Sequence, residues 1–287
     1  MNEARLDIGA LTLRVEGGKG VQSVMAMPGM AVFACDSEPT ITLTLDADIV
    51  PPAECRVLHR FEIADGNAEC CFSIDAEGVY YYSFSFGGLL RIDPRTPDRA
   101  QCSSIGNPHV LRFAVWLAYS MMGAAHGRVP IHSSTVAHRG RAVLCLGESG
   151  IGKSTHTRLW LNNIPDCHLL NDDSPILAIT PDGVEVYGSP WSGKTHCYRH
   201  EHYPVAAFLR LKQRPQNSIT RLPVLEAFSA LQPSLPPAMA HDELLLDKHV
   251  EMVSHMVATT PVFLMGCLPD AEAAQMSHNA IFRHNDN

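Results

Sequence analysis

The sequence has no excess of basic residues. Its 287 residues include 22 lysines and arginines against 30 aspartates and glutamates, which gives a formal net charge of -8 at pH 7. Nucleic acids and anionic membrane surfaces attract proteins with the opposite balance of charge. We therefore expect neither a nucleic acid nor a membrane among the partners of this chain.

A long apolar run, a targeting segment and a cysteine pair motif are also missing. No stretch reaches the ~20 apolar residues that cross a bilayer, and the first residues, MNEAR, contain no basic region followed by an apolar one. The nine cysteines are odd in number and form no CxxC pair, and the neighbours Cys70 and Cys71 could be bridged only with strain. Scattered cysteines are typical of a reducing compartment, so we expect a cytoplasmic protein.

Short alternating runs separated by polar turns fill the first third of the chain. Hydrophobic residues make up 46% of the sequence, enough for a core without a disulfide or metal. Alternation of apolar and polar residues, as in residues 11–15, 41–45 and 79–86, predicts strands. We predict a mainly β N-terminal region, residues 1–105. Its role is left open between a structural one and the recognition of a substrate or a sister subunit.

The remainder, residues 106–287, alternates helical and strand patterns without internal repeats. Such alternation is typical of an α/β domain. Helices are predicted over residues 109–123, 153–162, 223–231 and 241–257 and after residue 269, and strands over residues 131–137, 142–146, 167–170, 177–180, 184–187, 206–211 and 262–265.

Residues 147–154, GESGIGKS, match the phosphate-loop (Walker A) pattern GxxxxGK[ST] without a mismatch. Its glycines let the backbone curl so that successive N–H groups point at an anion, and the following helix adds the positive end of its dipole. Lys153 can reach the β- and γ-phosphates, and the Ser154 hydroxyl can bind Mg²⁺. We predict an ATP or GTP site formed by Gly147, Glu148, Ser149, Gly150, Ile151, Gly152, Lys153, Ser154 and Thr155.

An acidic pair, Asp172 and Asp173, ends the short apolar run that follows the loop. A carboxylate at the end of such a strand can hold Mg²⁺. A second carboxylate there can accept the proton of an attacking hydroxyl. Taken alone, the pair would be interpreted as a solvated turn. Its position downstream of a phosphate loop favours a functional role.

Together these segments resemble the HPr kinase/phosphorylase family and its distant relatives, the PEP carboxykinases. The resemblance covers about residues 128–212. It is carried by residues 147–154 and by the segments Ile131-His132-Ser133-Ser134, Leu170-Asn171-Asp172-Asp173 and Glu185-Val186-Tyr187-Gly188.

The resemblance implies an α/β fold with a P-loop kinase-like core of the HPr kinase/PEP carboxykinase type, residues 106–287, preceded by the mainly β part. It also implies an ATP-dependent kinase that uses Mg²⁺ and transfers the γ-phosphate to a hydroxyl of a protein, a peptide or a small metabolite. By position, the implied catalytic residues are Asp172, Asp173, His132 and Lys153, and the implied metal ligands are Ser154, Asp173 and Glu185.

The chain departs from the family pattern at Ser133, where the family has glycine, and at Tyr187, where it has arginine. Residues 188–194, GSPWSGK, replace a longer glycine-rich signature. Two alternatives therefore stay open: a PEP carboxykinase-like lyase, and a non-catalytic nucleotide-binding partner in a modification or regulatory pathway. A homo-oligomer is compatible with the sequence, which does not specify an oligomeric state.

Three weaker features remain. Residues 189–194 could close over a substrate, with Lys194 facing developing negative charge, or could form a structural turn around Trp191. Arg210 and Lys212 flank the end of a predicted strand, where they could face a substrate, although solvation at the strand end is favoured. Three histidines have a spacing that could suit zinc, but the loop-like surroundings favour ordinary histidines: His196, His200 and His202.

Overall fold

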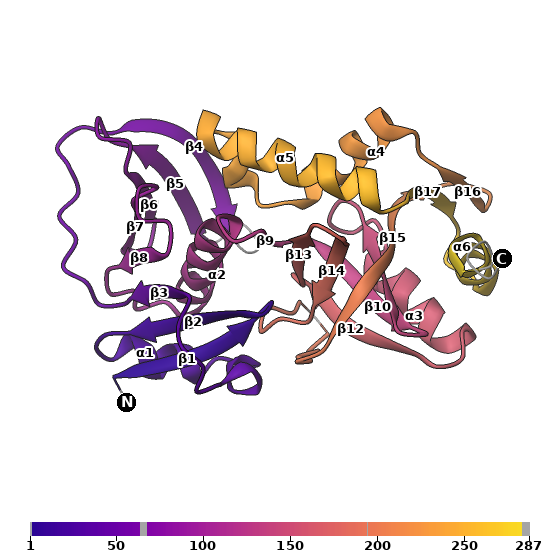
Figure 1. Cartoon of the computed structure of the whole chain (residues 1–287), viewed down its shortest axis with the longest axis horizontal. Helices are drawn as coiled ribbons and strands as arrows, with labels where there is room; N and C mark the ends of the chain where they lie inside the picture. Colours follow the sequence, from indigo (N-terminus) through magenta and orange to yellow (C-terminus); the bar gives the residue numbers. More distant parts are fainter. Residues whose placement is uncertain (1, 64–67, 194, 283–287) are drawn as a thin grey trace. The chain divides into compact units, whose positions relative to one another are not determined.

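The computed structural model describes residues 2–63, 68–193 and 195–282 (Figure 1). The chain is a mixed α/β protein with two large sheets and divides into two compact units. Unit 1 contains Met1–Arg128 and Ala238–Leu246, and unit 2 contains Val129–Pro237 and Asp247–Asn287. The boundary predicted after residue 105 lies N-terminal to this division, because the next helix packs on the sheet of unit 1.

Unit 1 is built on an eight-stranded sheet with the order β1-β2-β3-β8-β7-β6-β5-β4. The β2–β3 and β3–β8 pairs are parallel and the other neighbouring pairs are antiparallel. The strands are β1 (Glu3–Ile8), β2 (Leu11–Glu16), β3 (Ile41–Thr44), β4 (Arg56–Ile63), β5 (Ala68–Ile74), β6 (Tyr80–Phe84), β7 (Leu89–Ile92) and β8 (Arg99–Cys102). The shorter elements are α1 (Gly20–Met25), η1 (Met30–Phe33) and η3 (Pro237–Ala240).

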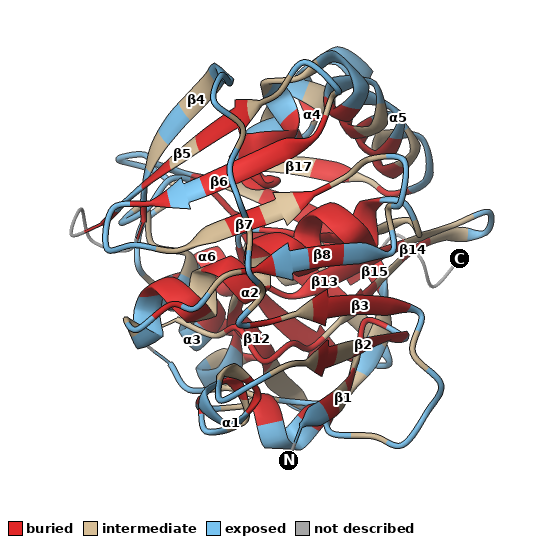
Figure 2. Ribbon diagram, turned by 90° about the vertical axis from the view of Figure 1, so that its left-hand side faces the viewer, coloured by how far each residue is buried: buried red, intermediate tan, exposed pale blue. Residues whose placement is uncertain are grey.

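One face of this sheet is apolar and carries the helix α2 (Pro108–Ala124), which packs against β3, β7 and β8. The register places the buried residues Ile92, Ala100, Leu43 and Val15 in one row across four strands. Along β8, exposed and buried residues alternate, as the period of two requires (Figure 2). The buried helix predicted over residues 109–123 is therefore observed, with Asn107 as its N-cap.

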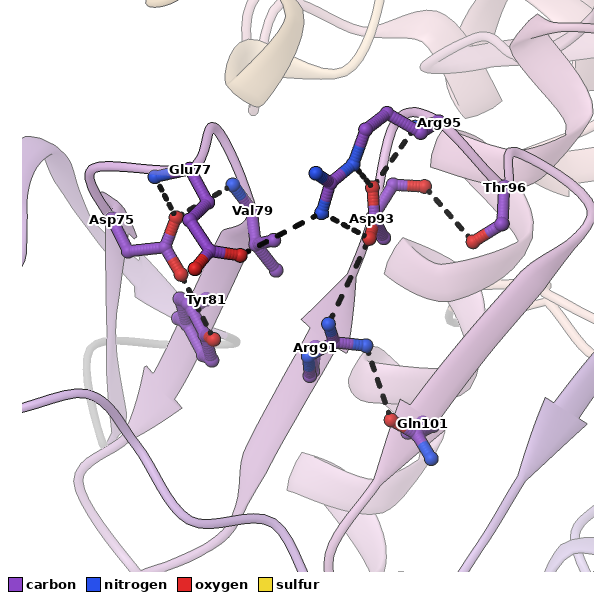
Figure 3. A network of polar contacts seen from close by, with 9 residues as sticks. All are labelled: Asp75, Glu77, Val79, Tyr81, Arg91, Asp93, Arg95, Thr96 and Gln101. Atoms are coloured by element: carbon purple, nitrogen blue, oxygen red, sulfur yellow. Dashed lines mark hydrogen bonds and ion pairs between the residues drawn. The ribbon is translucent and has the colours of Figure 1, made fainter.

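The opposite face of the sheet is polar and carries a connected set of charges on β6, β7 and the adjoining turns (Figure 3). Arg95 donates to both carboxylate oxygens of Asp93 at 2.8 Å, and Arg91 lies 3.8 Å from the same carboxylate. The Arg95 hydrogen bonds lower the pKa of Asp93 to about 2. Asp75 is likewise held by two backbone amides and by the Tyr81 hydroxyl. This face is therefore compatible with water, as one face of an antiparallel sheet commonly is.

The segment Ala238–Leu246 belongs to unit 1 although it is distant from it in sequence. The Tyr80 hydroxyl donates to Asp242 at 2.6 Å, and the His241 ring stacks on His59 with centroids 3.7 Å apart. Helix α5 (Glu243–Thr259) starts in this segment and continues into unit 2. It starts two residues after the helix predicted from residue 241.

Unit 2 is built on a nine-stranded sheet with the path β12-β10-β11-β15-β14-β13-β9, and β17 pairs with both β15 and β16. The β11–β15 and β15–β17 pairs are parallel, whereas β10 is antiparallel to both of its neighbours. Its strands are β9 (Arg128–Pro130), β10 (Ser133–His138), β11 (Arg141–Leu146), β12 (Cys167–Asp173), β13 (Ile176–Thr180), β14 (Gly183–Tyr187), β15 (His202–Gln213), β16 (Ser218–Arg221) and β17 (Val262–Cys267). The other elements are α3 (Lys153–Asn163), α4 (Val224–Leu231), η2 (Gln232–Ser234) and α6 (Ala271–Phe282).

Helices α3 and α6 pack together over this sheet around the fully buried Trp160. The indole N–H of Trp160 donates to Ser277 Oγ at 2.9 Å and to His156 Nε2 at 3.3 Å. The other ring nitrogen of His156, Nδ1, has no partner among the described residues. Burial lowers the pKa of His156 to about 4. Across the residues that the structure describes, no helix is both long and apolar enough to cross a bilayer.

The buried imidazole of His156 predicts acid sensitivity. The unfolded chain takes up this proton near the ordinary pKa of 6.5 and the folded chain only near 4. The contribution of His156 to stability is therefore complete above pH 6.5 and is lost progressively as the pH falls towards 4, by up to about 3 kcal/mol. Urea unfolding at pH 7.0 and 4.5, followed by circular dichroism, should show a smaller pH dependence for His156→Gln than for the wild type. The exposed His109→Gln is the control, and an equal pH dependence in all three proteins would contradict the assignment.

Candidate functional site

Residues 147–152 connect the buried end of β11 to the first turn of α3. Gly147 and Gly152 have φ of 147° and 111°, a region that favours glycine. A Cβ at Gly147 would lie 2.6 Å from the side chain of Ile151. Gly152 is the N-cap of α3 and has no side chain with which to cap the first amides of the helix. The first amides of α3 therefore have no side-chain cap.

The ammonium group of Lys153 folds back over the start of the loop. Its Nζ donates to the carbonyl oxygen of Gly147 at 2.8 Å and to that of Glu148 at 3.3 Å. Burial lowers the pKa of Lys153, and the nearby carboxylates of Asp173 and Glu148 oppose this change. Lys153 is thus a partly desolvated cation placed at the mouth of the loop.

Asp172 lies beside the loop because of the strand order. Strand β12 runs parallel to β11 on the far side of β10, so the carboxyl ends of both strands reach the same edge of the sheet. The register pairs Ser134 with Asp172 and Ser133 with Asp173. The Ser154 hydroxyl donates to Asp172 Oδ1 at 2.8 Å, and Asp172 is only 6% exposed. Ser154, a predicted metal ligand, is thereby in direct contact with Asp172, a predicted catalytic residue.

The neighbouring Asn171 is fully buried and fixes the acidic pair in place. Its Oδ1 accepts from the backbone amides of Asp173 and Ser174 at 3.0 and 2.9 Å. Its Nδ2 donates to the Trp191 carbonyl at 3.1 Å and to Ser189 Oγ at 3.3 Å. Sequence reasoning included this residue only as part of the acidic segment. The side chain connects the end of β12 to the chain that follows β14.

The chain after β14 is anchored against the acidic pair. The amide of Gly193 donates to the Asp172 carbonyl at 2.9 Å, and Trp191 is buried. Trp191 is packed inward, as the structural interpretation of this segment requires, and Ser192 forms a β-bridge to Asp173. Lys194, predicted to face substrate, lies outside the described residues.

His132 and Asp173 face each other at the same edge of the sheet. His132 Nε2 lies 4.0 Å from Asp173 Oδ1, and both side chains are about half exposed. The backbone amide of His132 donates to the Ser234 carbonyl at 2.7 Å. Desolvation, followed by the positive charge of Lys153, lowers the pKa of His132. The imidazole is therefore neutral at physiological pH.

Glu185 is separate from this group. It lies on β14, which stands beyond β15 in the strand order, and its carboxylate accepts a hydrogen bond from the Tyr187 hydroxyl at 2.8 Å. The Tyr187 ring stacks on His202 with centroids 4.7 Å apart. Among the described residues, the contacts thus gather Lys153, Ser154 and the two aspartates with His132, and the role of Glu185 as a metal ligand stays a prediction.

Sequence reasoning missed Arg210, which we expected to be solvated at a strand end. In the parallel β11–β15 pair, Arg210 lies opposite Leu146, the residue before the loop. Its Nη2 is 2.6 Å from Glu148 Oε1 and its Nη1 donates to Ser234 Oγ at 3.4 Å, and the side chain is only 18% exposed. Only the strand order could have indicated this position, because parallel neighbours end at the same edge.

A cavity of about 610 Å³ lies next to the C-terminal half of the loop, which is within the usual range for small-molecule sites. Thr155, His156 and Leu159 of α3 line one side, and Arg214, Pro215 and Leu268 contribute to another. Of the predicted nucleotide-binding residues, Gly150, Ile151, Gly152 and Thr155 border this cavity.

No group of three or more histidine, cysteine, aspartate or glutamate side chains suited to a metal occurs among the described residues. The three closely spaced histidines do not form such a group. His196 Nδ1 lies 3.0 Å from the Tyr198 hydroxyl, and His202 stacks on Tyr187. A magnesium ion held mainly by phosphate oxygens and water would need fewer protein ligands.

Comparison with known proteins adds little to this description. No protein-family model matches the chain, and no curated protein matches it. Among solved structures, the Hpr(Ser) kinase/phosphatase from Coxiella burnetii is similar, with a TM-score of 0.33 and 12% sequence identity over 54% of this chain and 89% of that chain. These values indicate a distant structural similarity at most. The site is therefore interpreted from its own geometry.

The buried hydrogen bonds of Asn171 predict that its side chain is essential to the shape of the site. Asn171→Ala removes four buried hydrogen bonds, to the amides of Asp173 and Ser174, to the Trp191 carbonyl and to Ser189 Oγ, which we expect to lower the free energy of unfolding by about 2–4 kcal/mol. Urea denaturation measures this loss, with Asn163→Ala as the matched control, because Asn163 makes one hydrogen bond at the end of α3. Equal losses in the two variants would show that Asn171 has no special role.

Proposed function

We propose that the chain is a nucleotide-dependent phosphotransferase that transfers the γ-phosphate of ATP to a hydroxyl of a protein, peptide or small metabolite. The observation that carries the proposal is the 2.8 Å contact between the Ser154 hydroxyl and the Asp172 carboxylate, next to the Lys153 ammonium at the start of α3. Phosphoryl transfer uses oxygen ligands for a metal ion, a cation and the N-terminus of a helix. Here the Ser154 hydroxyl and the Asp172 carboxylate lie beside the Lys153 ammonium at the start of α3.

The proposed nucleotide lies along the loop, with its phosphates against residues 147–155. The curled backbone and the first turn of α3 supply amides to the phosphates. Lys153 can exchange its bonds to the Gly147 and Glu148 carbonyls for phosphate oxygens. The 610 Å³ cavity beside Gly150–Gly152 and Thr155 is a suitable place for the nucleoside.

The donor set fits Mg²⁺, which prefers hard oxygen ligands and keeps several waters. Ser154 and Asp172 supply a hydroxyl and a carboxylate oxygen in contact, and Asp173 adjoins them in the chain. Glu185, the third predicted ligand with Ser154 and Asp173, is engaged by Tyr187 and stays a prediction. When bound, Mg²⁺ neutralises charge on the phosphates of the nucleotide.

The two aspartates have different surroundings, which suggests a division of roles. Asp172 is buried and accepts from Ser154, whereas the Asp173 side chain is 46% exposed and faces His132. We assign proton acceptance from the attacking hydroxyl to Asp173. Neutral His132 can donate one hydrogen bond to the transferring phosphate, and the remaining catalysis is positioning.

The proposal is tested by phosphate transfer from labelled ATP, with free serine, a carrier protein and candidate peptides offered in parallel. We expect transfer to at least one acceptor. Lys153→Ala and Asp173→Asn should each reduce the rate by roughly 10²-fold or more, because each removes a group that acts on the reacting atoms. Lys248→Ala, which removes a partly exposed lysine paired with Glu251 on α5, should retain the wild-type rate.

Other outcomes identify the alternatives. Release of CO₂ from oxaloacetate in the presence of nucleotide, without phosphate transfer to hydroxyls, would favour a PEP carboxykinase-like lyase. Nucleotide binding by the wild type that survives Asp173→Asn, with no transfer by the wild type to any acceptor, would favour a non-catalytic nucleotide-binding partner.

A further inference from the structure

The two cations beside the loop are engaged by atoms of the loop itself. Arg210 Nη2 lies 2.6 Å from Glu148 Oε1, and Lys153 Nζ bonds the carbonyl oxygens of Gly147 and Glu148. Residue 148 therefore interacts with both cations, through its side chain and through its backbone. An anion that enters the loop must compete with these contacts.

The Arg210 side chain is held in place independently of Glu148. The parallel register sets it opposite Leu146, and Nη1 donates to Ser234 Oγ. Ser234 also accepts the backbone amide of His132 through its carbonyl. Burial is the main cause of the lowered pKa of Lys153 and of His132, and the charge of Arg210 adds to it in both cases, so Arg210 is within electrostatic reach of the groups assigned to the phosphate. Arg210 is thus a fixed, largely buried cation.

Glu148, in contrast, is exposed. Its side chain is 75% accessible, against 18% for Arg210. An exposed carboxylate can leave such a pair at little cost, because exposed ion pairs contribute little. Carboxylate and phosphate groups present similar anionic oxygens to a guanidinium group. A phosphate oxygen can therefore replace Glu148 at Arg210 and leave the carboxylate in water.

The position along the loop indicates which phosphate meets Arg210. The cavity suited to the nucleoside borders residues 150–152 and Thr155, whereas Glu148 belongs to the N-terminal end of the loop and Arg210 pairs with it there. His132, assigned to the transferring phosphate, is joined to Arg210 through Ser234. A phosphate chain that runs from the cavity along the loop reaches Arg210 with its terminal group.

We propose that Glu148 is a built-in competitor for the terminal phosphate of a nucleoside triphosphate. The phosphate displaces the Glu148 carboxylate from Arg210, and Arg210 then makes the site prefer a triphosphate over a diphosphate. This inference rests on the proposed nucleotide-dependent function and adds a specificity residue to it.

The test is a double-mutant cycle by isothermal titration calorimetry on the full chain at one fixed ionic strength. The proteins are the wild type, Glu148→Gln, Arg210→Gln and the double variant, and the ligands are Mg-ADP and the Mg complex of a non-hydrolysable ATP analogue. Glu148→Gln should bind the triphosphate about two- to fivefold more tightly, the range expected when an exposed competing carboxylate is removed. Arg210→Gln should weaken the triphosphate roughly tenfold or more, and the diphosphate much less. In the double variant, the gain from Glu148→Gln should disappear.

A matched control is the exposed Lys248–Glu251 pair on α5. Glu251→Gln and Lys248→Gln change the net charge by the same amounts and should leave both affinities unchanged. Circular dichroism melts establish folding. If Arg210→Gln does not fold, Arg210→Lys is used in its place. The effect of Glu148→Gln on the ratio of triphosphate affinity to diphosphate affinity then still tests the preference.

The inference and the function on which it rests fail in different ways. Two results would contradict the competition while still supporting a nucleotide site. In the first, the wild type binds the triphosphate and Glu148→Gln does not change the affinity. In the second, Glu148→Gln changes the affinity equally in the wild-type and Arg210→Gln backgrounds. An equal weakening of both nucleotides by Arg210→Gln overturns the assigned preference. No binding of either nucleotide to any of the proteins overturns the proposed function, and the inference with it.

Discussion

The site depends on one constraint, that parallel strands end at the same edge of a sheet. Strands β11, β12 and β15 share a direction. Their carboxyl ends therefore place the loop, the acidic pair and Arg210 side by side. The hydrogen bond from Ser154 to Asp172 connects two of these ends directly. Without the shared direction, residues separated by up to 62 positions in sequence, such as Glu148 and Arg210, could not meet.

The residues around the site stabilise this edge of the sheet and have no part in the proposed reaction. Asn171 uses both ends of its side chain to connect β12 with the segment after β14. Trp160 and His156 fix α3 against α6 below the loop. The backbone positions of Lys153 and Ser154 at the start of α3 are therefore set by a packed core. Unit 1 has its own sheet, helix and polar face. Its role stays open between a structural one and recognition.

Local patterns predicted the elements around the loop well and the long-range contacts poorly. The strand before residue 147, the helix after residue 152 and the buried helix near residues 109–123 follow from periodicity and glycine placement within a few residues of sequence. The position of the acidic pair downstream of the loop suggested a role at the same site. Asp172 does contact the start of α3 through Ser154, although β10 separates β12 from β11 in the sheet. Strand order, however, depends on contacts between distant parts of the chain, so local patterns do not predict it.

Arg210 illustrates this limit, because its sequence neighbourhood resembles an ordinary strand end and only the β11–β15 pairing places it at the loop. The domain division illustrates it as well. The boundary predicted after residue 105 rested on a proline-containing polar stretch. The observed division instead follows the packing of α2 and includes a distant segment, Ala238–Leu246, in unit 1.

The central claim is that residues 147–154 bind the phosphates of a nucleotide. A crystal structure with Mg²⁺ and a non-hydrolysable ATP analogue tests it most directly. The account predicts phosphate oxygens against the amides at the start of α3, the Lys153 ammonium turned from the Gly147 carbonyl towards them, and Mg²⁺ beside Ser154 and Asp172. A nucleotide bound elsewhere, with the Lys153 and Ser154 contacts unchanged, would contradict it.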